Sequence, residues 1–224
     1  MTPVVARLRL PAERQEEFRF RYRVYVDELG LRPREADHAR RLLPDEFDRY
    51  ACSYALVADG EIVGAVRLIF IEDLPDPGQL IERFSMGPAL AFCGASAICT
   101  TSRFIIDVRF RGRKSMLLLM EEVFRDARAR GMRLNYGDCS APLLSFYTRL
   151  GYHAYAPSFD DPSYGPKIPL IMLADAASRG PGRRWLASRA SFLLIVKPSP
   201  GSRNGMESGH GVVGIYPITR ASRP

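Results

Sequence analysis

Residues 103–114 read RFIIDVRFRGRK, an apolar run typical of a strand that leads into a strongly basic turn. The residues that follow, 114–130, have the wide apolar face of a long amphipathic helix. Backbone N–H groups at a helix N-terminus point outward and favour an anion, and Gly112 lets the main chain approach a ligand closely. The cations of the turn are Arg109, Arg111, Arg113 and Lys114. The segment predicts a phosphate cradle, with a basic turn that holds no ligand as the alternative.

The elements around this segment alternate between helix and strand. We expect helices at 12–29 and 141–150, strands at 51–58, 61–71, 98–107, 132–138, 152–157 and 168–174, and a polar loop at 31–50. Asp59-Gly60 is a hairpin signal between the first two strands, and Ser140 is expected to cap the second helix. The Pro- and Gly-rich residues 72–96 predict a long surface loop. This order predicts an α/β (α+β) domain with helices packed on a central sheet.

The chain divides near residue 175. Its 224 residues suit one domain with an appendage, and 46% hydrophobic with 25% charged residues is an ordinary globular composition. Residues 1–175 carry all the expected elements, whereas 176–224 are rich in Gly, Ser, Arg and Pro. We expect 176–224 to be a poorly ordered extension.

The chain has a net charge of +7, which indicates an acidic partner. Nucleic acid is disfavoured because the charges cluster in the basic turn and the tail rather than in a stripe with interleaved aromatic residues. The four cysteines form no C-x-x-C pair, so no metal site is expected. The absence of a signal-peptide core and of a spanning apolar run predicts a cytoplasmic protein without a transmembrane segment, and peripheral membrane contact stays open.

Residues 145–155, SFYTRLGYHAY, form the second informative segment. The end of a helix places Tyr147 near the sheet, where its hydroxyl could protonate a leaving thiolate. The alternative is a core tyrosine whose hydroxyl is already hydrogen-bonded.

Together the two segments resemble the GNAT superfamily of N-acyltransferases over roughly residues 50–174. Arg109 and Gly112 match the first two fixed positions of its pyrophosphate-binding turn, whereas Lys114 stands where a small residue is expected. The later F-Y-x-x-x-G-F/Y pattern is matched by Phe146, Tyr147, Gly151 and Tyr152. The resemblance implies a central mixed, mostly antiparallel sheet flanked by helices and an acyl-phosphopantetheine thioester as co-substrate, with no tightly bound cofactor.

The N-terminal third is similar to a narrower group, the acyl-homoserine-lactone synthases and the long-chain N-acyl amino acid synthases. Residues 21–31, RYRVYVDELGL, place Arg23 near Tyr25 as in the first helix of that group. Further matches are Asp45, Asp48, Arg67, Ser102, Arg103 and Phe104. The resemblance implies acyl carrier protein as partner and donor, and Arg23, Arg67, Ser102, Arg103 and Phe104 as substrate-binding residues.

Two departures bear on the amine acceptor. Lactone synthases usually carry Glu where this chain has Thr100, and they favour Trp where this chain has Leu31 nearby. Both argue against S-adenosylmethionine and favour an N-acyl amino acid synthase. The alternatives left open are a lactone synthase, an ordinary coenzyme A-dependent acetyltransferase, which Lys114 disfavours, and a non-catalytic acyl-binding module.

Amide formation from a thioester needs a neutral amine, a polarised carbonyl and an exit for the thiolate. Glu28, Asp45 or Asp48 could take the amine proton, although an ion-pair network around the two aspartates is at least as good a reading. Arg67 and Arg103 could hold the carboxylate of an amino acid or be structural. The expected strand at 98–107 could offer backbone N–H groups to the carbonyl oxygen. Residues that could line an acyl slot are Phe84, Met86, Leu90, Phe92 and the helix at 116–127, which more readily belongs to the core.

Overall fold

The computed structural model describes residues 2–174 of the chain. The expected C-terminal extension, 176–224, therefore lies outside the described residues. Within the described part, no helix is long and apolar enough to cross a membrane, and no group of three or more His, Cys, Asp or Glu residues is placed to hold a metal ion.

One mixed sheet organises the molecule. The strands are β1 (Val4–Leu8), β2 (Cys52–Ala58), β3 (Glu61–Phe70), β4 (Ile98–Ile106), β5 (Leu134–Cys139), β6 (His153–Ala154), β7 (Phe159–Asp161) and β8 (Gly165–Leu173). The α-helices are α1 (Pro11–Tyr22), α2 (Gly78–Arg83), α3 (Gly87–Cys93), α4 (Arg113–Ala129) and α5 (Leu144–Arg149). The strand order is β1-β2-β3-β4-β5-β8-β6, with β7 paired to β8, and only β4 and β5 are parallel neighbours. The expected mixed, mostly antiparallel sheet is confirmed.

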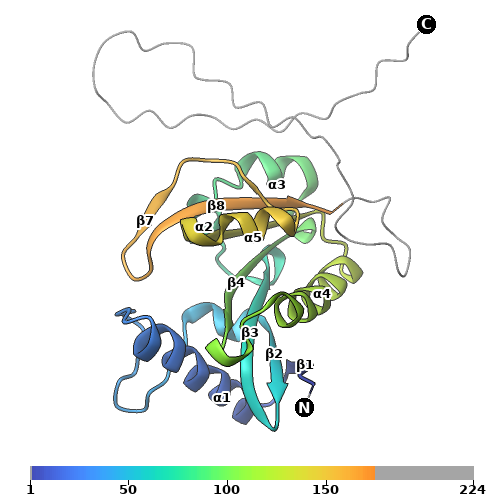
Figure 1. Ribbon diagram of the computed structural model, residues 1–224. Helices are drawn as coiled ribbons and strands as arrows, with labels where there is room; N and C mark the ends of the chain where they lie inside the picture. The colour runs from blue at the N-terminus through green and yellow to red at the C-terminus, as the bar shows by residue number, and fades with distance from the viewer. Residues whose placement is uncertain (1, 175–224) are drawn as a thin grey trace, which may run out of the picture.

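The parallel pair opens partway along its length. β4 and β5 pair only from Ile98↔Leu134 to Thr100↔Tyr136. Beyond that point β4 continues beside β3, while β5 continues beside β8. A Cβ on Gly137, just past the last pair, would lie 3.1 Å from the Thr101 carbonyl oxygen, so the glycine lets the strands stay close where they begin to part. Figure 1 shows β4 running from the β1–β3 half of the sheet to the β8 half.

A β-bulge interrupts β4 beside this gap. Ala65 faces Ile105 and Arg67 faces Ser102, so β4 has one more residue than β3 in this interval. Within it Arg103 has φ of 55°, a left-handed conformation that costs a non-glycine residue energy. A bulge leaves a main-chain group outside the ladder and turns a side chain in a new direction.

Helices cover both faces of the sheet (Figure 1). Leu119, Val123 and Phe124 of α4 join the core cluster that also contains Tyr147 of α5. The opposite face carries α2 and α3, with Leu80 buried among Ile69 and its neighbours. It also carries α1 and the π-helix that follows it, Arg23–Glu28, whose Phe20 and Val24 pack with Ala65 and Ile105. The face of α4 expected from the sequence is therefore part of the core.

Several expectations about local structure are wrong. Residues 72–96 are no surface loop, because α2 and α3 form there and bury the side chains of Leu74, Leu80, Phe84, Met86 and Ala89. The expected helix at 12–29 ends as α1 at Tyr22 and continues as a π-helix, Arg23–Glu28. Ser140 occupies the N-cap of a 3₁₀ turn, Ala141–Leu143, but its side chain makes no cap hydrogen bond. β1 and β7 have no counterpart among the expected strands.

Candidate functional site

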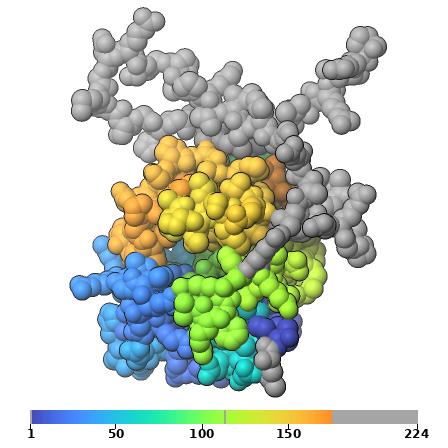
Figure 2. Space-filling view, in the orientation of Figure 1, coloured from blue at the N-terminus to red at the C-terminus, as the bar shows by residue number. Residues whose placement is uncertain are grey.

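A cavity of about 910 Å³ opens where β4 and β5 separate. It lies where the blue and green N-terminal part of the molecule meets the yellow and orange C-terminal part (Figure 2). Ile69, Leu80 and Phe84 line it from the face covered by α2, and Phe104 and Tyr147 line it from the face covered by α5. The walls of the cavity therefore come from both faces of the sheet.

Arg67, on β3, lines the cavity with most of its guanidinium already hydrogen-bonded. Its Nε donates to Ser102 Oγ at 3.0 Å, and its Nη1 bonds to Asp45 and, at 3.0 Å, to Asp48 Oδ1. The residue is only 4% exposed. Its positive charge is therefore balanced within the protein, as the ion-pair reading of these residues expected.

Arg103, the left-handed residue of the bulge, is held in the same way. Its Nε and Nη2 donate to Asp45 Oδ2 at 3.1 and 2.7 Å, and Nη2 also donates to Glu35 Oε1 at 3.1 Å. Its guanidinium carbon lies 4.6 Å from the centre of the Tyr164 ring and 5.8 Å from that of Tyr25. These contacts fix the bulge in place and join β4 to the loop before β2 and to the β7–β8 turn.

The geometry disfavours Asp45 and Asp48 as general bases. Burial raises the pKa of Asp45, but Arg67 and Arg103 more than offset this and hold the pKa well below its ordinary value. Asp48 accepts hydrogen bonds from Arg67 and from Arg21, and its own Oδ2 accepts from the Asp45 main-chain N–H at 2.7 Å. Asp45 binds a proton too weakly to accept one readily from an amine, and the oxygens of Asp48 are already occupied by hydrogen bonds.

The first-helix arginine in this network is Arg21, not Arg23. Arg21 is fully buried, donates from Nη1 to both Asp48 oxygens at 2.8 and 2.9 Å, and bonds through Nη2 to Glu17. The Arg23 side chain is 48% exposed, bonds to Asp107 Oδ2 at 3.0 Å and does not line the cavity. The spacing of Glu17 and Arg21 by four residues was the signal for the pair, since residues at i and i+4 share a helix face.

Glu28 also lies outside the cavity wall. Its carboxylate bonds to Arg111 Nη2, and Arg111 Nε donates to the Ile106 carbonyl at 2.9 Å. The pair ties the end of the π-helix to the basic turn. This position gives Glu28 a structural partner and does not support its predicted role as the base.

Tyr147 lines the cavity at the end of α5. It is 8% exposed, and rings of Phe146, Tyr152 and Phe104 pack against it edge to face, with centroids 5.3, 5.5 and 6.4 Å away. Its hydroxyl has no hydrogen-bond partner among residues 2–174, which differs from the expected core tyrosine. Burial, together with Tyr152, raises the pKa of Tyr147 well above its ordinary value, so the phenol keeps its proton.

The basic turn precedes α4 as expected. Gly112 is the N-cap, with extended backbone and no heavy atom within 4 Å of a Cβ placed on it, and Lys114 is exposed. Arg109 is bonded to Asp107, at 3.0 Å from both Nε and Nη2. The described side chains of the turn, among them Arg109, Arg111 and Lys114, do not line the cavity. The open N-terminus of a 17-residue helix can still accept an anion there.

The apolar wall differs from the acyl slot expected from the sequence. Phe84 lines the cavity, but Met86, Leu90 and Phe92 do not, and Phe92 instead packs under Arg133. Phe104 does line it and stacks on Phe146, with ring centroids 5.9 Å apart. The apolar end of the cavity is therefore built by α2 and the sheet.

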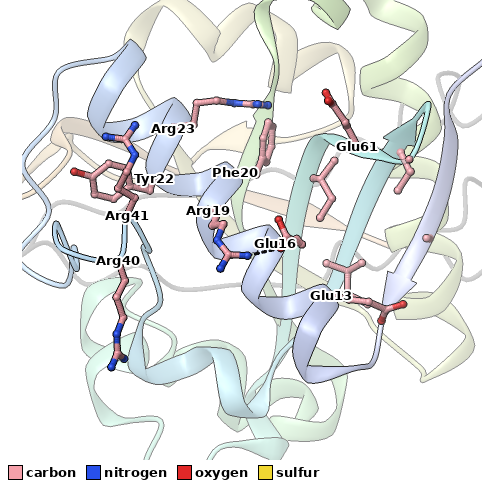
Figure 3. A pocket seen from close by; sticks show the side chains of 14 residues that line it. Glu13, Glu16, Arg19, Phe20, Tyr22, Arg23, Arg40, Arg41 and Glu61 are labelled. Atoms are coloured by element: carbon pink, nitrogen blue, oxygen red, sulfur yellow. Dashed lines mark hydrogen bonds and ion pairs between the residues drawn. The ribbon is translucent and has the colours of Figure 1, made fainter.

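A second hollow of about 670 Å³ lies between α1 and the β2–β3 hairpin (Figure 3). Its charged walls are Glu13, Glu16, Arg19, Arg23, Arg40, Arg41 and Glu61. The charges are mixed, and the arginine side chains are 47–79% exposed. Of the predicted site residues it contains Arg23 alone, which confirms that Arg23 is separate from the Arg67 and Arg103 cluster.

Part of the chain matches a known protein family. Residues 20–121 match the family model described as an acetyltransferase (GNAT) domain. No curated protein matches the chain by sequence.

Solved structures resemble the chain over most of its length. BjaI, a CoA-dependent acyl-homoserine lactone synthase, is 15% identical with a TM-score of 0.60 over 78% of this chain and 85% of its own. FeeM, an N-acyl amino acid synthase from uncultured soil microbes, is 16% identical with a TM-score of 0.59 over 77% and 92%. TofI is 22% identical with a TM-score of 0.58 over 79% and 93%. At these identities the likeness confirms the expected fold, but it does not assign the substrates.

Proposed function

Because residues 20–121 match an acetyltransferase (GNAT) domain and the fold resembles that of BjaI and FeeM, we propose that the chain transfers a long-chain fatty acyl group from acyl-carrier protein or acyl-CoA to the amine of an amino acid. The product is an N-acyl amino acid. The observation that carries this proposal is the cavity through the gap between β4 and β5, which holds the unpaired hydroxyl of Tyr147.

The donor would bind with its phosphate at the N-terminus of α4. The outward N–H groups there and the exposed Lys114 favour an anion. From this point the pantetheine arm would extend toward the gap, and the acyl chain would lie against Phe84 and Leu80. The net charge of +7 suits an acidic carrier protein as the donor.

Two of the chemical steps have an assisting group in the cavity. The bulge at Arg103 interrupts the β4 ladder, and a main-chain N–H released from the ladder there would bind the thioester carbonyl oxygen. The ammonium first loses one proton to solvent, and the neutral amine then attacks the carbonyl carbon. As the C–N bond forms and the C–S bond breaks, Tyr147 donates a hydrogen bond to the departing thiolate, and the proton that the nitrogen loses goes through solvent to that sulfur, which leaves as a thiol. Asp45 and Asp48 hold Arg67 and Arg103 in place beside the gap rather than taking the proton of the acceptor.

A lactone synthase that uses S-adenosylmethionine is the second candidate, favoured by the structural likeness to BjaI. Against it, the cavity wall has the neutral Thr100, 2% exposed, where lactone synthases usually carry Glu. A non-catalytic acyl-binding module is a further alternative, against which the unpaired Tyr147 hydroxyl counts.

One experiment separates these possibilities. The full chain is incubated with a long-chain acyl-carrier protein or acyl-CoA and either a pool of the twenty standard L-amino acids or S-adenosylmethionine, and the products are identified by mass spectrometry. We expect an N-acyl amino acid. A homoserine lactone as the sole product would replace the proposal with the lactone synthase, and bound donor without any product would favour the acyl-binding module.

Lys114→Glu is expected to raise the KM for the acyl donor roughly fivefold and to leave the KM for the amine nearly unchanged, because it repels a phosphate at the helix N-terminus. The increase should be larger at low ionic strength. Arg9→Glu, an equal charge change at an exposed residue before α1, is the control. Equal effects of the two variants on donor KM would contradict phosphate binding at this turn.

A further inference from the structure

Most charges in the cavity already have partners, and Lys167 is an exception. Arg67 and Arg103 are balanced by Asp45, Asp48 and Glu35, as described above. Lys167, on β8, is half-buried and lines the same cavity, but forms no ion pair with any residue of 2–174. Its Nζ lies 5.9 Å from the centre of the Tyr164 ring. Lys167 therefore retains a full positive charge that a ligand can neutralise.

Asp138, at the end of β5, provides the opposite charge. Its Oδ2 accepts from Arg83 Nη2 at 3.0 Å, whereas Oδ1 has no partner among the described residues. Arg83 is shared with a second carboxylate, since its Nη1 donates to Asp161 Oδ2 at 2.9 Å. The single guanidinium of Arg83 is therefore paired with the two carboxylates of Asp138 and Asp161. Together these three side chains leave a net negative charge in the cavity wall.

The strand register puts Asp138 and Lys167 on one face of the sheet. Asp138 pairs with Pro169 in the antiparallel β5–β8 ladder, and Lys167 is two residues from Pro169. Such diagonal neighbours lie roughly 7–8 Å apart. Burial and Asp138 raise the pKa of the Cys139 thiol to about 11 and Lys167 opposes the rise, so both charges act on a side chain that lines the cavity.

We propose that Asp138 and Lys167 form the binding site for a zwitterionic α-amino acid, with the ammonium at Asp138 and the carboxylate at Lys167. The ammonium of such a ligand can donate to Asp138, and its carboxylate can accept from Lys167, through charge-assisted hydrogen bonds of about 2.8 Å. This inference rests on the proposed function and names the acceptor site within it. It assigns the carboxylate to Lys167, because Arg67 and Arg103 are already neutralised by carboxylates of the protein.

The test compares Lys167→Met with the wild-type chain on three acceptors: the best-acylated L-amino acid, its amide, and the amine that lacks the carboxyl group. For the amino acid, kcat/KM should fall roughly 10- to 100-fold, as for loss of a charge-assisted hydrogen bond. The values for the amide and the amine should change less than about threefold. Lys167→Met should therefore lose most of the preference for acceptors that carry a carboxylate, and Lys167→Arg should restore part of that preference.

Arg34→Met is the matched control, because Arg34 is an exposed cation that lines the same cavity and has no ion pair within residues 2–174. It should affect all three acceptors alike. Asp138→Asn should weaken all three acceptors, since each has the amine. An unchanged carboxylate preference in Lys167→Met, with normal acylation by the wild type, would overturn the assignment and leave the proposed function intact.

Calorimetry tests the assignment without catalysis, because it measures the binding of amino acids directly. Each of the twenty standard L-amino acids is titrated into the wild-type chain, and any that binds is titrated into Lys167→Met. We expect binding to weaken at least tenfold in the variant. A wild type that binds none of the twenty, or a variant that binds equally well, overturns the assignment whether or not the chain transfers an acyl group.

Discussion

Tyr147→Phe is expected to lower kcat roughly 100-fold and to leave the KM of the acyl donor within about threefold of its wild-type value. The free hydroxyl faces the cavity, so its removal takes away a donor that acts when charge develops on the leaving sulfur. An ordinary thiol has a pKa of about 8.5, below that of the buried phenol. Tyr147 should therefore stabilise the thiolate through a hydrogen bond before any complete proton transfer.

The fold should tolerate this change. The hydroxyl has no partner within residues 2–174, and the ring keeps its packing against Phe146 and Tyr152. The melting temperature should stay within a few degrees of the wild-type value, which circular dichroism measures. Because the raised pKa keeps the phenol protonated, wild-type kcat should show no loss from Tyr147 deprotonation up to about pH 10. Equal kcat values for variant and wild type would remove Tyr147 from the mechanism.

Features that depend on neighbours in sequence were predictable. The Asp59-Gly60 turn joins β2 and β3 with Asp59 and Gly60 both at positive φ, as a two-residue hairpin requires. The apolar periodicity before Gly131 predicted α4, and the apolar run before the basic turn predicted β4. In each case the local chain preference and the tertiary packing agree.

Features that depend on distant contacts were not predictable. Residues 72–96 contain proline and glycine, which indicate a loop, yet the apolar side chains of Leu80 and Phe84 gain enough burial on the sheet to form short helices. Arg21 looked like an ordinary polar residue, because its partner Asp48 lies 27 residues away. The same holds for Asp138 and Lys167, which only the β5–β8 ladder brings to one face.

Arg21→Met is expected to lower the free energy of unfolding by roughly 3–5 kcal/mol. Although burial lowers the pKa of Arg21, Glu17 and Asp48 raise it above its ordinary value, so the residue is a buried cation between two buried carboxylates. Its removal leaves Glu17, which is also fully buried, without its closest cation. Breaking a buried pair on one side costs this much because a charge remains uncompensated. The melting temperature should fall by roughly 10 °C.

Arg23→Met is the matched control, because it is two residues further along and its side chain is half exposed with a single carboxylate partner. We expect it to cost less than about 1 kcal/mol, the usual value of an exposed ion pair. Adding Glu17→Gln to Arg21→Met should recover part of the loss, since the unpaired charge is then gone. Equal unfolding free energies for the two arginine variants in urea would mean that the buried network does not hold α1 against the loop that carries Asp48, and with it the cavity wall formed by Asp45 and Arg67.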